Sequence, residues 1–483
     1  MYFSPFVFER GSIKVNFKKL YMNRPFWKAA LGLAIPIALQ NLLSASFSLV
    51  DTFMVAKLGG DHLAAMGMAG QWSWLLNIFI FGLVSGTSLF IAQYWGVKDL
   101  RSIHRTSGIA ITSSILISVI FTLTGAVHPE FIINVFSKTP QIVEYGSDYL
   151  RIASYSYPAV ALNLIFCAIL RSTEKVKLPV VVSLFTAVLN AVLNYCLIFG
   201  IAFFPEMGIE GAALATCISS WAGVIILVLI SYVQKNILIA PMNQLFGFSA
   251  KHFRLFYRRA IPVIFNEAAW GLGTVVINAI FSNMGDDYYT GVTIYRTFEN
   301  IAYVFIIGLC NACSVMIGKS IGSGQIERAK EDAWRYTAIM PVACIATGAI
   351  VVLFREYFVM AFTSGAEYSP AAITAAVGCL LVYGCEMPIR NIPYLMVVGI
   401  FRPGGNSKLA MICELCCLWF ISIPLTAIFA FVFKLPFIYV FLFMFLLEDV
   451  PKTALCLYNF IRDKWINPVT EEGRIAFEKY KKK

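Results

Sequence analysis

The sequence has few charged residues: Asp, Glu, Lys and Arg make up 13% of its 483 residues, whereas hydrophobic residues make up 59%. A soluble domain carries about 25% charged residues, so this composition excludes a soluble enzyme and a disordered chain. The apolar residues fall in continuous runs of about 20, the length that crosses a hydrocarbon core. Continuous runs also exclude a β-barrel, whose strands alternate apolar and polar residues. The sequence therefore predicts an all-α integral membrane protein.

Groups that carry chemistry are scarce as well. The four histidines are scattered near loops and form no cluster with metal-ligand spacing. Most of the twelve cysteines lie inside apolar runs, as reduced and buried cysteines do. The stretch from Cys313 to Ser320 ends like a phosphate-binding loop, but it closes a predicted span instead of following a strand. We expect no enzyme activity, no cofactor and no metal, apart from a Na⁺ ion that could bind near Asp51.

Hydropathy predicts twelve membrane-spanning helices, and an even number places both termini on the same side of the membrane. The two terminal segments and the loops of that side hold 30 of the 38 Lys and Arg residues, and basic loops stay in the cytoplasm. We expect a multi-pass protein of the plasma (inner) membrane with both termini cytoplasmic. Its basic residues should contact anionic lipid and no nucleic acid. The expected spans are 32–56, 72–95, 107–128, 148–170, 179–203, 211–233, 259–283, 293–317, 336–358, 371–400, 408–432 and 436–460.

The chain matches itself at an offset of 226 residues, and the matching positions include prolines and glycines: Pro36/Pro262, Gly59/Gly285, Gly82/Gly308 and Gly96/Gly322. Each repeat contains six helices, so both repeats enter the membrane in the same direction. They predict two six-helix bundles related by a pseudo-two-fold axis along the membrane normal, as in transporters that rock two bundles. The expected parts are an N-terminal cytoplasmic arm (1–31), an N-lobe (32–233), a cytoplasmic linker (234–258), a C-lobe (259–461) and a basic cytoplasmic tail (462–483).

Asp51 is a carboxylate well inside the first span. A charge at the bilayer centre costs about 2.5–3.5 kcal/mol, so such an acid is either paired or functional. Gln40 falls within about 40° of Asp51 around the helix, and no Lys or Arg precedes Lys57 on this span. Asp51 is therefore a candidate proton acceptor or, beside amide oxygens, a candidate Na⁺ ligand. The alternative is a hydrogen-bonded acid near the outer membrane surface.

Two asparagines, Asn190 and Asn194, lie four residues apart and so share one face of the fifth span. Small polar side chains of this kind often link helices by hydrogen bonds. They are also suited to complete a cation site with Asp51. The sequence leaves both interpretations open.

The second repeat has its own acid, Glu267, which follows Pro262 and Asn266 in the seventh span. It does not occupy the position equivalent to Asp51. We include Glu267 and Asn266 among the candidate cation-binding residues. Because proline breaks the hydrogen-bond ladder of a helix, Pro36 and Pro262 are candidate conformational hinges.

Opposite charges occur at helical spacing in three later spans, and we expect most of them to be neutralised pairs. Glu386, in the tenth span, is also a candidate for gating or substrate binding. Glu414 lies near the inner end of its span and is expected to be solvated. The expected pairs are Glu386/Arg390, Arg296/Glu299 and Glu448/Lys452.

With these residues in hand, the chain resembles the multidrug and toxic compound extrusion family over nearly its full length. The resemblance rests on the order and spacing of four stretches. They are 36–59 with Val50-Asp51-Thr52-Phe53, 170–200 with Leu170-Arg171-Ser172-Thr173, 208–216 with Gly208-Ile209-Glu210-Gly211, and 399–408 with Phe401-Arg402-Pro403-Gly404-Gly405.

The resemblance implies a twelve-helix, V-shaped antiporter whose two lobes alternate access and export organic cations against Na⁺ or H⁺ influx. The acid of the family's first helix would be Asp51, its fifth-helix site would include Asn190, and its seventh-helix acid matches Glu267. Some members place a second acid where this chain has Asn194, which weakens a pure proton relay. The expected partners are a small organic cation, the coupling ion and the bilayer, and we expect a monomer.

Two other functions stay open from the sequence. A flippase for lipid-linked oligosaccharides, from the same superfamily of folds, would favour a large cationic cavity, which uncompensated acids oppose. A polytopic membrane enzyme would need a nucleophile or a metal cluster at the membrane face, and the sequence offers neither.

Overall fold

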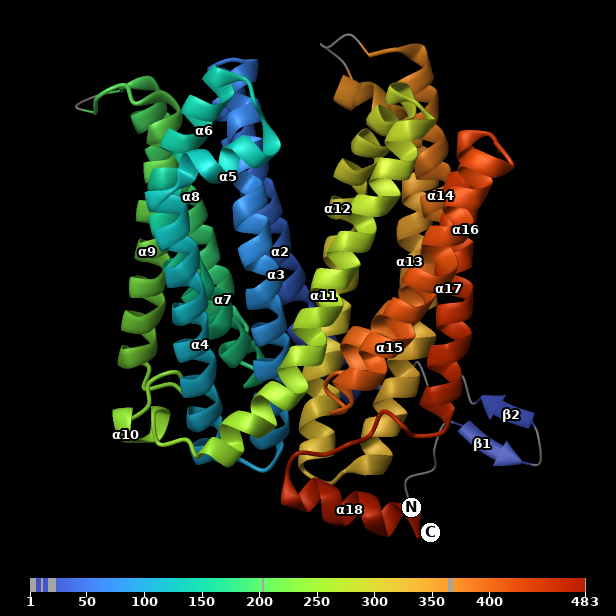
Figure 1. Cartoon of the computed structure of the whole chain (residues 1–483). Coiled ribbons are helices and arrows are strands. Elements are labelled where there is room, and N and C mark those ends of the chain that lie inside the picture. The colour runs from blue at the N-terminus through green and yellow to red at the C-terminus, as the bar shows by residue number, and fades with distance from the viewer. Residues whose placement is uncertain (1–5, 10–11, 16–22, 202–203, 364–367, 483) are drawn as a thin grey trace. The chain divides into compact units, whose positions relative to one another are not determined.

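The computed structural model describes residues 6–9, 12–15, 23–201, 204–363 and 368–482. These residues are almost entirely helical (Figure 1). The elements are β1 (Phe6–Glu9), β2 (Ser12–Val15), α2 (Arg24–Ala56), α3 (Gly60–Gly96), α4 (Leu100–Val127), α5 (Pro129–Phe136), α6 (Pro140–Ala153), η1 (Ser154–Ser156), α7 (Tyr157–Ser172), α8 (Lys177–Phe199), α9 (Gly208–Val233), α10 (Met242–Leu245), α11 (Ala250–Met284), α12 (Asp286–Gly322), α13 (Ile326–Thr363), α14 (Pro370–Tyr394), η2 (Leu395–Phe401), α15 (Ser407–Cys417), η3 (Leu418–Ser422), α16 (Ile423–Ala427), η4 (Ile428–Val432), α17 (Phe437–Ile461) and α18 (Glu471–Lys481).

The predicted class, an all-helical membrane protein, is confirmed. Within the described residues, 11 helical segments are long and apolar enough to cross a membrane. The twelfth expected span is α17, a helix of 25 residues that carries Glu448, Asp449 and Lys452 in its length. Helices dominate because a bilayer offers no water to the backbone, so each segment must satisfy its own N–H and C=O groups.

Two local features differ from the expectation. The N-terminal arm contains a short antiparallel pair, in which Phe6 of β1 lies opposite Val15 of β2. The fourth span begins earlier than residue 148, because α6 starts at Pro140 and continues through η1 into α7. Pro129 and Pro140 each stand in the first turn of a helix, where the missing N–H of proline leaves no unpaired donor.

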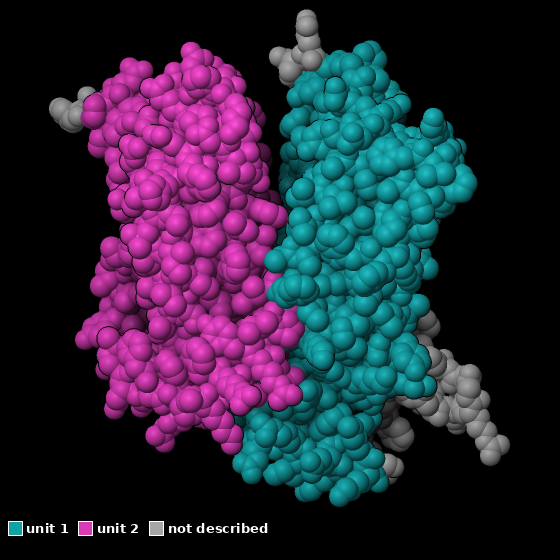
Figure 2. All heavy atoms as spheres, in the orientation of Figure 1, with its two compact units in different colours: residues 1–38, 92–97, 265–483 teal, residues 39–91, 98–264 magenta. Residues whose placement is uncertain are grey.

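The chain forms two compact units, coloured separately in Figure 2. Unit 1 contains residues 1–38, 92–97 and 265–483, and unit 2 contains residues 39–91 and 98–264. The helices α2 and α11 are each divided, after residues 38 and 264, which are 226 apart like the sequence repeats. Each division follows two residues after an intrahelical proline, Pro36 in α2 and Pro262 in α11.

The first part of each divided helix packs on a glycine of the other repeat's second helix. In unit 1, a Cβ on Gly308 of α12 would lie 2.9 Å from the Cβ of Ala38 of α2. In unit 2, a Cβ on Gly82 of α3 would collide with Ile264 of α11. Gly82 and Gly308 are repeat mates, and so are Ala38 and Ile264. The duplication therefore repeats a helix contact as well as a sequence.

The basal end of unit 1 is defined here as the region where α3 and α12 end and α13 begins. There, a Cβ on Gly96 would collide with the carbonyl oxygen of Lys319, and a Cβ on Gly322 would collide with that of Gln93. Both pairs are repeat mates, since each partner is offset by 226 residues. Only glycine lets the two helix backbones approach this closely.

We expect Gly322→Ala to lower the stability of the protein by about 1–3 kcal/mol, the usual cost of overpacking. The matched control is Gly67→Ala in α3, since a Cβ there meets nothing within 4 Å and alanine is the better helix former. Thermal unfolding in detergent measures both. Equal midpoints for the two variants would contradict the close approach of α3 and α12.

Candidate functional site

Unit 2 brings together the acid of the first span and the two asparagines of the fifth. Nδ2 of Asn194 on α8 donates a hydrogen bond to Oδ1 of Asp51 on α2. The same Nδ2 lies 3.3 Å from Oδ1 of Asn190. Nδ2 of Asn190 in turn lies 3.4 Å from the hydroxyl of Ser219 and 3.5 Å from that of Thr216, both on α9. The result is a polar chain that links α2, α8 and α9.

Asp51 has no ion-pair partner among the described residues of the chain. The groups that act on its carboxyl are Asn194 and, electrostatically, the buried phenol of Tyr149. Asn194 is fully buried, and its Oδ1 atom has no hydrogen-bond partner within the described part of the structure. A buried carboxylate beside an unpartnered amide oxygen is an arrangement that favours a proton or a hard cation.

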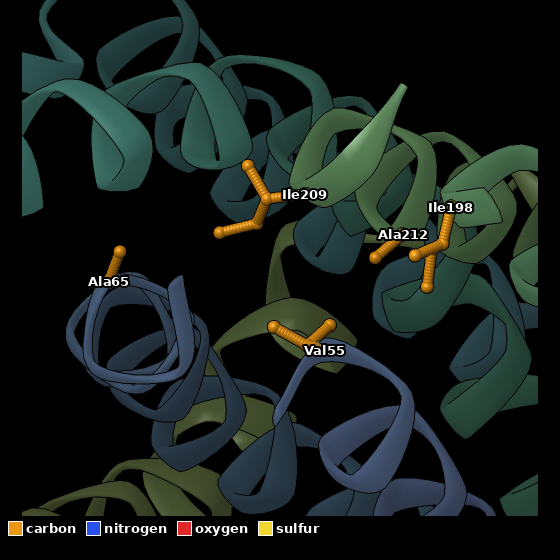
Figure 3. Close-up of a cluster of buried hydrophobic side chains, with 5 residues drawn as sticks. All are labelled: Val55, Ala65, Ile198, Ile209 and Ala212. Carbon is orange, nitrogen blue, oxygen red and sulfur yellow. The ribbon is translucent and has the colours of Figure 1, made fainter. Parts of the chain in front are cut away.

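An apolar cluster lies one helical turn beyond this polar chain. Val55 follows Asp51 by four residues on α2, and Ile198 follows Asn194 by four residues on α8. Figure 3 shows these two side chains with the other members of the cluster. The members, all at most 5% exposed, are Val55, Ala65, Ile198, Ile209 and Ala212. A water-free neighbour of this kind strengthens the electrostatic interactions of Asp51.

Gln40 is not part of this group, although it shares a helix with Asp51. Eleven residues of α2 separate them, about 16 Å along the axis. Nε2 of Gln40 lies 3.2 Å from the hydroxyl of Ser183 and 3.5 Å from Sγ of Cys167. Its buried Oε1 has no partner within the described ranges. Helix periodicity places residues on one face but does not place them at one depth.

In unit 1, the acid of the seventh span lies in an ion cluster. Oε1 of Glu267 on α11 lies 2.6 Å from Nη2 of Arg402, the residue that follows η2. The same Nη2 lies 3.8 Å from Oε2 of Glu414 on α15. Asn266 donates a 2.6 Å hydrogen bond to that carboxylate oxygen. One buried guanidinium thus serves two carboxylates.

The expectation that Glu414 is solvated was wrong. Its side chain is 12% exposed, and that of Arg402 is 4% exposed. A carboxylate at this depth needs a cation and hydrogen bonds to offset its desolvation. Arg402 and Asn266 supply both, and they come from segments too distant in sequence for spacing to reveal them.

Glu386 on α14 is the least compensated acid in unit 1. It is 3% exposed, and neither of its carboxyl oxygens has a hydrogen-bond partner in the described residues. The charged groups that act on it are those of Asp449, Arg390, Glu448 and Lys452. Such a group needs a bound proton or cation to remain buried.

The expected Glu386/Arg390 pair is wrong. Nη1 of Arg390 lies 2.8 Å from Oε1 of Glu299 on α12, and its guanidinium lies 4.7 Å from the ring centre of Phe445. The contact with this ring and the pairing with Glu299 direct Arg390 away from its own helix. This stacking is a favourable use of the planar cation.

The expected Arg296/Glu299 pair is wrong as well, because Nη2 of Arg296 instead donates a 2.7 Å hydrogen bond to Oδ1 of Asn278. The Glu448/Lys452 pair is confirmed at 2.8 Å. Lys452 also lies 2.8 Å from Oδ1 of Asp449. The sequence analysis overlooked Asp449, although its i,i+3 spacing from Lys452 was a signal for it.

An apolar pocket of about 450 Å³ lies between α11 and the α15–η3 segment. Trp419 closes part of it by donating a 3.1 Å hydrogen bond to the carbonyl of Ala269. Its walls contain no charged side chain, so Glu267 and Glu414 do not line it. The lining residues are Phe265, Ala268, Ala269, Leu272, Leu415, Cys416, Trp419 and Phe420.

These features define a class: a helical multi-pass membrane protein, built from a duplicated six-helix unit, with buried acids in both repeats. A family model described as MatE matches residues 36–196 and again residues 262–428. The two matches start at Pro36 and Pro262, 226 residues apart, so the family model itself finds the repeat. Because they cover more than half of the chain, the chain belongs to the MatE family, whose members are membrane transporters and not enzymes.

Relatives match over most of their length. A probable multidrug resistance protein NorM from Thermotoga maritima is 23% identical over 442 residues, which cover 91% of this chain and 93% of that protein. An uncharacterized transporter YisQ from Bacillus subtilis is 22% identical, over 86% of this chain and 90% of that protein. A crystal structure of MATE in complex with MaL6 shares the fold with a TM-score of 0.82 at 19% identity, over 92% of this chain and 98% of that one.

Proposed function

We propose that this chain is a secondary active antiporter that exports organic cations, drugs among them, in exchange for Na⁺ or H⁺. The observation that carries the proposal is Asp51: a carboxyl within a membrane span, held by Asn194 and without a cationic partner in the described residues. A structural acid at this depth would be expected to have one. The names of the multidrug-resistance relatives support the export of drugs.

Exchange requires that the ion and the drug favour different states, since a ligand with equal affinity for two states shifts neither. Ion binding at Asp51 neutralises the carboxylate and removes its attraction for a cationic drug. The helix is free to bend at Pro36, two residues before α2 passes from one unit to the other. Pro262 gives α11 the same freedom.

In the second repeat we assign different roles to two acids. Arg402 already neutralises Glu267, so Glu267 binds a transported cation only when the guanidinium leaves it. Glu386 has no such partner in the described residues, and it is the carboxyl of this repeat best placed to carry a proton or cation. Asn266 positions Glu414 and not Glu267.

We propose the plasma (inner) membrane as the location, with both termini in the cytoplasm and the chain acting as a monomer. The distribution of Lys and Arg supports this orientation, since 30 of the 38 lie in the termini and the loops of one side.

Reconstituted protein tests the proposal directly. We expect proteoliposomes to expel a fluorescent organic cation when a Na⁺ gradient or a pH gradient is imposed, and not when both are absent. Whichever gradient drives efflux names the coupling ion. Efflux under neither gradient would reject the antiporter, and transbilayer movement of lipid-linked sugars would then be measured.

A further inference from the structure

The chain does not end at its last span. After α17, residues 462–481 run across the basal end of unit 1 and finish in α18 (Figure 1). We call this segment the C-terminal strap. Its side chains are anchored, because Trp465, Ile466 and Val469 are at most 5% exposed. Trp465 packs against Phe460 with ring centres 5.9 Å apart.

The strap is fastened to the turn that follows η2. The N–H of Asn467 donates a 2.7 Å hydrogen bond to the carbonyl of Gly404, and Ile466 pairs with Gly405 as an isolated antiparallel bridge. Nδ2 of Asn406 donates a 2.8 Å bond to the carbonyl of Lys464. Gly405 has a φ of +95°, a conformation that favours glycine.

The strap also holds the beginning of α13 and the end of α12. Nζ of Lys330 lies 2.7 Å from Oδ2 of Asp463 and 2.6 Å from the hydroxyl of Tyr480. The hydroxyl of Thr470 donates a 2.7 Å bond to the carbonyl of Gly322 and caps α18.

Gln93 joins the strap to α3 with both ends of its side-chain amide. Its Oε1 accepts a 2.8 Å hydrogen bond from the N–H of Val469, and its Nε2 donates one of 2.8 Å to the carbonyl of Pro403. Gln93 is fully buried. Its repeat mate is Lys319, so this amide clamp exists in one repeat only and breaks the pseudo-symmetry of the basal end.

The position of Gln93 gives the contact its meaning. Three helices pass from one unit to the other: α2, α11 and α3, and α3 does so between Ile91 and Ala92. Both α2 and α11 have a proline just before the division, whereas α3 contains none. A helix without a proline resists a sharp kink. If the units move relative to each other, the end of α3 has to come free.

We propose that the C-terminal strap is a conformational latch, which holds α3 through Gln93 in this state and releases it once in each transport cycle. The proposal goes beyond the antiport reaction and rests on it only where transport is the measured quantity. A latch present in one repeat adds stability to one of two access states, and so shifts their populations.

The first test measures the latch without transport. Gln93→Leu keeps the approximate size of the side chain and removes both hydrogen bonds. We expect amide hydrogen exchange of residues 462–481 in the full-length protein to accelerate about tenfold or more. The matched control is Gln71→Leu, at an exposed position of the same helix. Unchanged exchange in Gln93→Leu would overturn the role of this residue.

The second test fixes the latch. Lys330→Cys and Asp463→Cys are combined in a chain in which the exposed Cys385 and Cys416 are replaced by serine, and the pair is joined by a short bifunctional thiosulfonate. We expect joined protein to lose at least about nine-tenths of its efflux rate and to regain it on reduction. Joined protein that transports at the rate of the unjoined pair would overturn the proposal. A pair that cannot be joined would overturn it too, because the strap would not lie where it is described.

If wild-type protein shows no efflux under any gradient, the antiport proposal fails and the exchange measurement alone decides the latch. If wild-type efflux is normal and the joined pair is unaffected, the latch fails and the antiport proposal stands. The two failures are therefore distinguishable.

Discussion

Replacing Asp51 by asparagine is expected to reduce gradient-driven efflux to near the rate of empty liposomes. The substitution preserves the size of the side chain and removes the charge that Asn194 contacts. Hydrogen bonds to charged groups are worth roughly 1.5–3 kcal/mol, so binding of the coupling ion should weaken by about 10- to 100-fold. Efflux of a fluorescent cation from proteoliposomes, at several ion concentrations, measures this loss.

The matched control is Asp61→Asn, an exposed acid in the first turn of α3, which should leave efflux unchanged. Thermal unfolding should show that Asp51→Asn remains folded, because no Lys or Arg in the described residues loses a partner. Glu386→Gln separates the contributions of the two repeats. Efflux that survives Asp51→Asn but is lost in Glu386→Gln would move the coupling site to unit 1 and contradict the assignment to Asp51.

Replacing Arg402 by methionine is expected to have the largest effect on stability. The substitution leaves the carboxylates of Glu267 and Glu414 without their cation at side-chain exposures of 21% and 12%. Removing one partner of a buried pair costs about 3–5 kcal/mol. We expect a large fall in the thermal midpoint in detergent. Adding Glu267→Gln to Arg402→Met should recover part of that fall, because one uncompensated charge disappears.

Arg151→Met provides the comparison. Arg151 lies 3.9 Å from Asp148, with side chains 52% and 36% exposed, and exposed pairs contribute about 0–1 kcal/mol. Its midpoint should therefore barely change. Additive effects of Arg402→Met and Glu267→Gln, with no recovery in the double variant, would show that the two side chains do not depend on each other.

The sequence located the membrane spans well because the signal is local. Hydrophobic runs of spanning length mark the helices, and the ends of α17 at residues 437 and 461 lie within one residue of the expected 436–460. The repeat was also readable, since prolines and glycines keep their spacing when apolar residues drift. The α5–α6 segment was missed because its short helices are not set by hydropathy.

Partners of the charged residues were harder to predict. The Glu448/Lys452 pair was found because both residues lie on one helix. Arg390 was assigned to the acid on its own helix, but it pairs with Glu299 across a helix contact. Gln40 shares a helix face with Asp51 but binds Ser183 and Cys167. Spacing along one helix gives a direction around the axis, and it says nothing of which helix lies in that direction.

The sequence by itself determined the class of the protein, its duplication and the identity of its buried acids, because composition and periodicity are properties of the chain alone. Only the tertiary structure decided which of those acids are neutralised. Asp51 faces an amide, Glu267 faces a guanidinium 135 residues away in sequence, and Glu386 has no hydrogen-bond partner in the described residues. The fate of a buried charge depends on what packing brings within a few ångströms, since desolvation makes each missing partner costly.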